Sequence, residues 1–210
     1  MLQASLSPKI MLPKFYQTHL KKQLTHAQFI LLTILLSLIQ SEKQVRLERL
    51  SRVFPYPITT ESRRRKLQRF LDLSNLTISL IWFPLVTYWL ITYCRVGTRL
   101  SIAIDRSQWG RINLFMVSLI WNQRAIPLYW SLLPQLGNSN FESQTTNLQQ
   151  VLPLFSEYKV IVLGDREFCS VDLGNWLRKK GVSFCLRLKK NPCIETEHLF
   201  WQRLDKLGII

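Results

Sequence analysis

The sequence predicts a mixed α/β protein in which a basic helical region, residues 1–96, precedes a sheet-containing domain, residues 97–210. Before Gly97 the apolar residues recur at helical spacing, whereas after it they alternate or form short β-branched runs. The net charge is +15, and it is uneven: residues 1–99 hold 15 Lys and Arg against 4 Asp and Glu, a net of +11. This balance favours a polyanionic partner, either nucleic acid or an anionic membrane surface.

Three helices are expected first in the basic region. One begins near Thr25 and is apolar around most of its circumference, as in a helix buried inside a bundle. A short second helix covers residues 45–54. Thr59 or Thr60 can cap a third helix over residues 61–73, since threonine side chains accept hydrogen bonds from the first free backbone amides.

The third helix carries a strongly basic side. Its basic residues are Arg63, Arg64, Arg65, Lys66 and Arg69. Such a face is either a solvated surface or a contact with DNA phosphates. Because the whole region is so basic, we favour contact with double-stranded DNA.

Two apolar stretches, residues 24–39 and 73–94, raise the alternative of a membrane protein. The second stretch has no charge, but Pro84 and several polar residues interrupt it. Buried helices of a soluble domain explain both stretches, so we expect no membrane partner. The cysteines show no C-x-x-C spacing and are expected to be reduced thiols in the cytoplasm.

After Gly97 the predicted order is β-β-β-α-β-α-β. The strands are expected at 100–106, 113–121, 125–133, 159–163 and 183–188, with helices at 141–156 and from about 170 to 180. Ser139 and Glu142 form a capping-box signature for the first of these helices. This is the order of the ribonuclease-H-like fold, in which the first and fourth strands are parallel neighbours.

Asp105 and Asp165 stand at the C-terminal ends of these two strands, so their carboxylates are expected at the same edge of the sheet. Two adjacent carboxylates repel each other unless a cation lies between them. Mg²⁺ prefers oxygen ligands and can bind through one or two carboxylates plus a substrate phosphate. A lone Asp after a strand is often a turn former or helix cap. The pair together, in so basic a chain, favours metal-assisted phosphodiester chemistry.

Four motifs carry a resemblance to a known family. They are residues 104–109 (IDRSQW), 133–139 (LPQLGNS), 164–168 (GDREF) and 186–191 (LRLKKN). With them the chain resembles a DDE transposase of the insertion-sequence-4 type. The resemblance implies that Asp105 and Asp165 are the first two acids of the catalytic triad and bind Mg²⁺ or Mn²⁺.

The resemblance also implies a reaction, partners and a location. Such enzymes nick the ends of a mobile element, free a 3′-hydroxyl and join it to target DNA. The expected partner is therefore double-stranded DNA, of both transposon ends and target, and the resemblance allows a homodimer on that DNA. The expected location is the bacterial cytoplasm, in association with the nucleoid.

The third acid of such a triad is a glutamate in a Tyr-x-x-Arg-x-x-x-Glu-x6-Lys signature, which this sequence lacks. Glu195 and Glu197 follow the last strand too soon, and Glu167 should point away from Asp165 if the backbone is extended. We therefore assign none of them to the triad. The chain is expected to be a transposase truncated at its C-terminus. The alternative is an inactive DNA-binding remnant that competes with the full-length enzyme.

Four further basic residues are candidate DNA contacts. Arg106 and Arg166 each follow one of the two acids and either steer phosphate or pair with Asp105 and Asp165. Lys189 and Lys190 follow the last strand.

Overall fold

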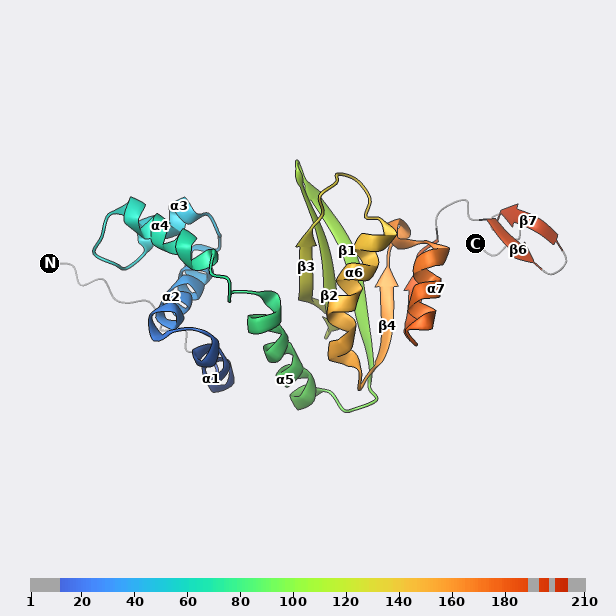
Figure 1. Ribbon diagram of the computed structural model, residues 1–210, viewed down its shortest axis with the longest axis horizontal. Coiled ribbons are helices and arrows are strands. Elements are labelled where there is room, and N and C mark those ends of the chain that lie inside the picture. The colour runs from blue at the N-terminus through green and yellow to red at the C-terminus, as the bar shows by residue number, and fades with distance from the viewer. Residues whose placement is uncertain (1–11, 189–192, 197–198, 204–210) are drawn as a thin grey trace. The chain divides into compact units, whose positions relative to one another are not determined.

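The computed structural model describes residues 12–188, 193–196 and 199–203 (Figure 1). The chain divides into two compact units, Met1–Trp89 and Leu90–Ile210. Lys189 and Lys190 lie outside the described residues, and so do the other residues of their motif beyond Leu188. In the described part of the chain, every helix is too short or too polar to cross a membrane.

The first unit is helical. Its elements are α1 (Lys14–Gln23), α2 (His26–Glu42), α3 (Leu47–Val53), α4 (Thr60–Leu71) and the π-helical turn η1 (Ile78–Trp82), and α5 (Phe83–Tyr93) includes the boundary between the units. Apolar side chains of α2, α3 and α4 form one core, made of Leu31, Leu35, Leu50, Phe54, Leu67 and Phe70. The burial of these side chains holds the short helices together, because isolated helices of this length are marginal in water.

Threonine caps fix where two of these helices begin. Thr25 accepts a hydrogen bond from the backbone of Gln28, and the Gln28 side chain accepts one from the backbone of Thr25, which completes a capping box. Thr59 caps α4 by accepting from the backbone N–H of Ser62 at 3.3 Å. The start of the basic helix α4 is therefore defined by its own sequence.

The second unit contains a five-stranded mixed sheet. Its strands are β1 (Arg99–Trp109), β2 (Ile112–Trp121), β3 (Arg124–Leu132), β4 (Lys159–Gly164) and β5 (Ser183–Leu186), in the spatial order β3-β2-β1-β4-β5. Strands β1, β2 and β3 form an antiparallel meander, whereas β4 lies parallel to both β1 and β5. Strands β6 (Cys193–Thr196) and β7 (Leu199–Arg203) pair separately.

Helices α6 (Phe141–Val151) and α7 (Val171–Lys179) cover one face of this sheet (Figure 1). Helix α6 contacts β2 and β3, α7 contacts β5, and the two helices contact each other. Many strand residues on this face are fully buried; among them are Ile102, Phe115, Val117 and Val162. The expected mixed α/β class is confirmed.

Strand β4 is less enclosed than its continuous apolar run indicated. Val160 and Val162 are buried, but Ile161 and Leu163 on the opposite side are only half-buried. A continuous apolar run such as residues 160–163 predicts a strand buried on both faces. Within the described residues that prediction was wrong for one face of β4. Large aromatic side chains on strands are by default expected to pack in the core, but Trp109 and Trp130 are 62% and 42% exposed.

Several predicted boundaries also differ. Strand β1 continues past Arg106 to Trp109, because it remains paired with β2 as far as the hairpin turn. Helix α6 is capped by Asn140, whose side chain accepts from the backbone N–H of Ser143 at 2.8 Å; Ser139 is therefore not the cap. After Val151 the chain tightens into a 3₁₀ turn, η2 (Leu152–Phe155), which contains a proline that has no N–H to donate.

The burial of Cys94 gives a test of this packing. Cys94 is buried, and its burial raises the pKa of the thiol, whereas Cys185 is exposed. Because the thiolate is the reactive form, iodoacetamide at pH 8 should modify Cys185 rapidly and Cys94 only slowly. Peptide mapping by mass spectrometry measures both rates. Equal rates in the folded protein would contradict the placement of Cys94, and equal rates in denaturant are the control.

Candidate active site

Asp105 and Asp165 occupy equivalent positions on neighbouring parallel strands. The pairing of β1 with β4 ends at Ile104 opposite Gly164, and each aspartate is the next residue of its own strand or turn. Neighbouring strands lie about 4.8 Å apart. The expected proximity of the two acids therefore follows from the observed register, although Asp105 lies within the long strand β1 and not at its end.

The alternation of the strand places both aspartates away from the helix-covered face. Along β1, Leu100, Ile102 and Ile104 are buried, so the odd-numbered residues point to the other side. Ala103 lies opposite Leu163 in the same register, and Asp165 keeps an extended backbone. Asp105 and Asp165 thus share one face at the edge of the β1–β4 pairing, and both are exposed.

The two carboxylates meet the requirements of a divalent cation. They supply hard oxygen donors, and none of the ion pairs formed by the described residues involves either of them. Asp165 uses Oδ1 to accept a hydrogen bond from the backbone N–H of Glu167 at 2.9 Å, which leaves Oδ2 open. The described residues contain no group of three or more Asp, Glu, His or Cys placed so that it could hold a metal ion. A cation here would have two carboxylate ligands from this part of the chain.

The Gly-Asp-Arg-Glu-Phe motif has a distinct physical role at almost every position. Gly164 makes room for close packing, because a Cβ there would lie 2.9 Å from both Leu186 and Phe168. Asp165 caps the 3₁₀ turn η3 (Arg166–Phe168) through its hydrogen bond to Glu167. Phe168 is buried and packs edge-on against Phe115, with 5.7 Å between the ring centroids. The motif therefore forces an abrupt turn directly after the strand.

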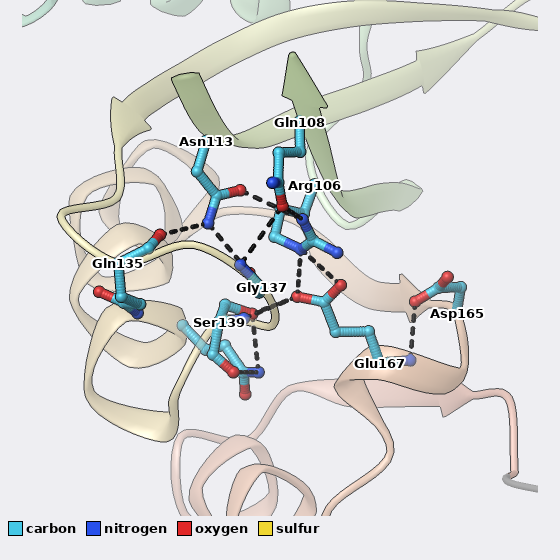
Figure 2. Close-up of polar contacts among 9 residues, drawn as sticks. Arg106, Gln108, Asn113, Gln135, Gly137, Ser139, Asp165 and Glu167 are labelled. Atoms are coloured by element: carbon cyan, nitrogen blue, oxygen red, sulfur yellow. Dashed lines mark hydrogen bonds and ion pairs between the residues drawn. The ribbon is translucent and has the colours of Figure 1, made fainter. Parts of the chain in front are cut away.

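Glu167 and Arg106 form a largely buried ion pair beside this turn (Figure 2). The Arg106 Nε lies 2.7 Å and 2.9 Å from the two Glu167 carboxylate oxygens. Their side chains are only 17% and 11% exposed. Arg106 was expected either to steer phosphate or to pair with Asp105. The second alternative was wrong, because the partner of Arg106 is Glu167. As Arg106 follows Asp105 on the strand, its side chain lies on the other face.

A polar network extends from this pair to the loop after β3 (Figure 2). Ser139 donates to Glu167 from both its backbone N–H, at 2.8 Å, and its hydroxyl, at 2.9 Å. Arg106 Nη1 donates to Asn113 Oδ1, and the Asn113 amide donates to the carbonyls of Gln135 and Gly137. Three of the four motifs noted in the sequence therefore meet in one hydrogen-bonded cluster.

Sequence reasoning missed this cluster. Glu167 was considered only as a third acid, while Asn113 and Ser139 were considered only as parts of a strand and a helix cap. A usable signal was the position of Glu167 inside a Gly-Asp-Arg-Glu-Phe motif, where a charged residue lies between a strand and a buried phenylalanine. A charge in that position needs a partner. The sequence could not show that the partner lies 61 residues away.

The basic residues of α4 differ in how far their charges are available. Arg63 donates to the carbonyls of Ser51 and Arg52 at 3.4 Å and 3.1 Å, so its charge stabilises the end of α3. Lys66 lies 4.6 Å above the ring of Tyr56. Arg65 is 68% exposed and Arg69 is also exposed.

Glu61 binds two arginines of the same helix. Its carboxylate accepts hydrogen bonds from Arg64 and Arg65, which lower the pKa of Glu61, while the pKa of Arg64 is raised in return. All three side chains are at least 34% exposed, and exposed ion pairs are weak. A polyanion could therefore replace Glu61 as the partner of Arg64 and Arg65 at a low cost in free energy. In the second unit Arg166 is exposed and, within the described residues, forms no ion pair with Asp165.

No protein-family model matches the sequence, and no curated protein matches it. Among solved structures, the chain is similar to the catalytic core domain of BIV integrase, at 11% identity and a TM-score of 0.34, over 44% of this chain and 57% of that one. It is similar to the catalytic domain of Mos1 mariner transposase at 10% identity and a TM-score of 0.30, over 49% and 55%.

The Mos1 strand transfer complex matches at 11% identity and a TM-score of 0.29, over 71% of this chain and 56% of that one. The chain thus spans just over half the length of these proteins. The structural neighbours are catalytic domains of an integrase and of transposases. At these scores the similarity assigns no activity to this protein.

Gly164 gives a test of the turn. Alanine at this position should destabilise the protein by about 1–3 kcal/mol, because its methyl group would overlap Leu186 and Phe168. Urea unfolding measures this loss. Gly174→Ala is a milder comparison, since a Cβ there would meet only the end of the Phe184 ring, at 3.0 Å. If Gly164→Ala were as stable as the native chain, the close approach after β4 would be wrong.

Proposed function

We propose that the second unit is the catalytic part of an enzyme that cleaves and joins DNA strands in transposition, of the insertion-sequence-4 type that its motifs resemble. The observation that carries this proposal is the register of β1 and β4, which ends directly before Asp105 and Asp165. Two exposed carboxylates on one face at adjacent strand positions suit a divalent cation, and the charge of +15 suits a nucleic-acid substrate.

In this proposal Asp105 and Asp165 hold Mg²⁺ or Mn²⁺. Such a cation, when bound, polarises a phosphodiester and lowers the pKa of a bound water or hydroxyl. The chain's own residues position the two carboxylates. The β1–β4 pairing fixes the distance between the carboxylates, and the hydrogen bond from the Glu167 backbone orients Asp165.

DNA contact is proposed for the exposed arginines of α4. Arg65 and Arg69 reach solvent, and Arg64 is held only by an exposed ion pair. Arg63 and Lys66 support the helix from within its own unit. Arg166, next to Asp165 and without an acidic partner among the described residues, is a further proposed phosphate contact in the second unit.

A second candidate function is DNA binding without cleavage. It is favoured by the two-carboxylate site, because the described residues bring no third acid to Asp105 and Asp165. The two candidates share α4 as their DNA contact and differ in whether the aspartates bind a metal. Metal binding is therefore measured first.

Replacing either aspartate should strongly weaken metal binding. Isothermal titration with Mn²⁺ is expected to show that Asp105→Asn and Asp165→Asn each weaken affinity by about 100-fold or more, since each change removes one of two carboxylate ligands. Asp172→Asn, which changes an exposed acid in the first turn of α7, is the matched control and should leave affinity unchanged. Native affinity in both aspartate variants would refute the metal site.

Salt dependence should identify the DNA-binding face. Changing both Arg65 and Arg69 to Gln should weaken binding to a DNA duplex and reduce the slope of log K against log salt by about 2, one for each lost phosphate contact. Glu61→Gln should act in the opposite direction, because it releases Arg64 and Arg65. Fluorescence anisotropy between 50 and 200 mM salt is the measurement, a range over which such contacts change affinity strongly.

Arg178→Gln is the control for this experiment, because it removes an exposed arginine from α7 instead of α4. If the double change on α4 altered the slope no more than Arg178→Gln does, α4 would not be the DNA contact.

A further inference from the structure

We propose that Glu167 is a positioning residue for the two-aspartate site and not one of its ligands. Together with Arg106 it joins the two strand ends that carry Asp105 and Asp165, and so fixes the separation and orientation of the two carboxylates. This inference rests on the proposed function, since it concerns the metal affinity of that same site.

The Glu167 carboxylate already accepts hydrogen bonds from three donor groups. Oε1 accepts from the Arg106 Nε, the Ser139 backbone N–H and the Ser139 hydroxyl at 2.8–2.9 Å, and Oε2 accepts from the Arg106 Nε at 2.7 Å. A carboxylate at 11% exposure with these partners has little capacity left for a metal. Turning it toward a cation would leave Arg106 buried without its partner, which is costly.

The location of the pair explains what it can control. Arg106 directly follows Asp105, and Glu167 lies two residues after Asp165. The last hydrogen-bonded partners of β1 and β4 are Ile104 and Gly164. The ion pair therefore continues the connection between the two chain segments beyond the point where their backbone pairing stops.

Glu167 also acts on Asp165 directly. Its side chain is anchored to β1 and to the loop at Ser139, while its backbone N–H donates to Asp165 Oδ1 at 2.9 Å (Figure 2). Any shift of the Glu167 side chain would move the donor that orients Asp165. Residues that orient metal ligands in this way typically change metal affinity by about 10- to 100-fold when they are replaced.

The face of the strand argues against direct ligation. Arg106 and Asp105 are consecutive in an extended strand, so their side chains point to opposite faces. Because Glu167 is bound to Arg106, its carboxylate lies on the face that Asp105 does not share. A cation held by Asp105 and Asp165 is therefore on the other side of the sheet from the Glu167 carboxylate.

A double-mutant cycle separates positioning from ligation. The variants are Glu167→Gln, Arg106→Gln and the double change. Gln carries its amide nitrogen where Arg carries Nε, and it is through Nε that Arg106 contacts Glu167. In the double variant a neutral Gln–Gln contact can therefore replace the ion pair, and Ser139 can still donate to the amide oxygen at position 167.

Positioning predicts that Glu167→Gln weakens Mn²⁺ binding by about 10- to 100-fold and that the double variant recovers to within about threefold of the native affinity. Ligation predicts that the double variant binds as weakly as Glu167→Gln, because both lack the same carboxylate. Titration calorimetry gives the affinities, and the thermal unfolding midpoint should recover in parallel. Failure of the double variant to recover affinity overturns the inference.

If a buried charge left without its partner prevents the single variants from folding, Ser139→Ala provides a second test. It removes the hydroxyl donor at 2.9 Å and leaves every acid in place. Positioning predicts weaker Mn²⁺ binding by several-fold, and unchanged affinity would count against it. If native binding of Mn²⁺ did not depend on Asp105 and Asp165 at all, the proposed function itself would fail. If that dependence holds and only the recovery is missing, the positioning role alone fails.

Discussion

The Arg106–Glu167 ion pair is the interaction on which the geometry at the C-terminal end of the β1–β4 pairing depends. Both charges are nearly buried, and removing one partner of such a pair typically costs about 3–5 kcal/mol, because the other charge is left without compensation. The pair is tolerated only because each member has further partners: Ser139 for the carboxylate, and Asn113 for the guanidinium. This requirement holds the loop after β3, the extension of β1 and the turn after β4 in one arrangement.

The same requirement explains why three short motifs far apart in the sequence belong together. Asn113 uses both ends of its amide, accepting from Arg106 and donating to the carbonyls of Gln135 and Gly137. Both hydrogen bonds are partly buried, so the loop cannot move without breaking them. The two aspartates are not part of the cluster's charge balance. They remain exposed beside this hydrogen-bonded cluster, as the proposed metal site requires.

The local sequence pattern predicted most of the helices and strands, and it placed Asp105 and Asp165 at the ends of two of those strands. The β-branched run before Gly164 and the alternation from Leu100 to Ile104 predicted the two strands, and the order of strands and helices predicted that they are parallel neighbours. Their register places Asp105 beside Asp165. What the pattern could not give was the partner of Glu167, because an ion pair across 61 residues depends on tertiary contact alone. The same limit applies to Arg63: helical spacing showed a basic side, but not that this guanidinium is bound to the end of α3. The number of basic residues in the sequence therefore overstates how many of them are free to contact a polyanion.

The distribution of acids gives the two-aspartate site a definite electrostatic character. A third carboxylate close to Asp105 and Asp165 would add to the electrostatic repulsion between them. Here the acid nearest in sequence, Glu167, is neutralised by Arg106 and lies on the other face of the strand. The repulsion between Asp105 and Asp165 is thereby kept to a single pair, at an exposed edge where water screens it. The geometry that brings these two carboxylates together is thus maintained by a different pair of charges.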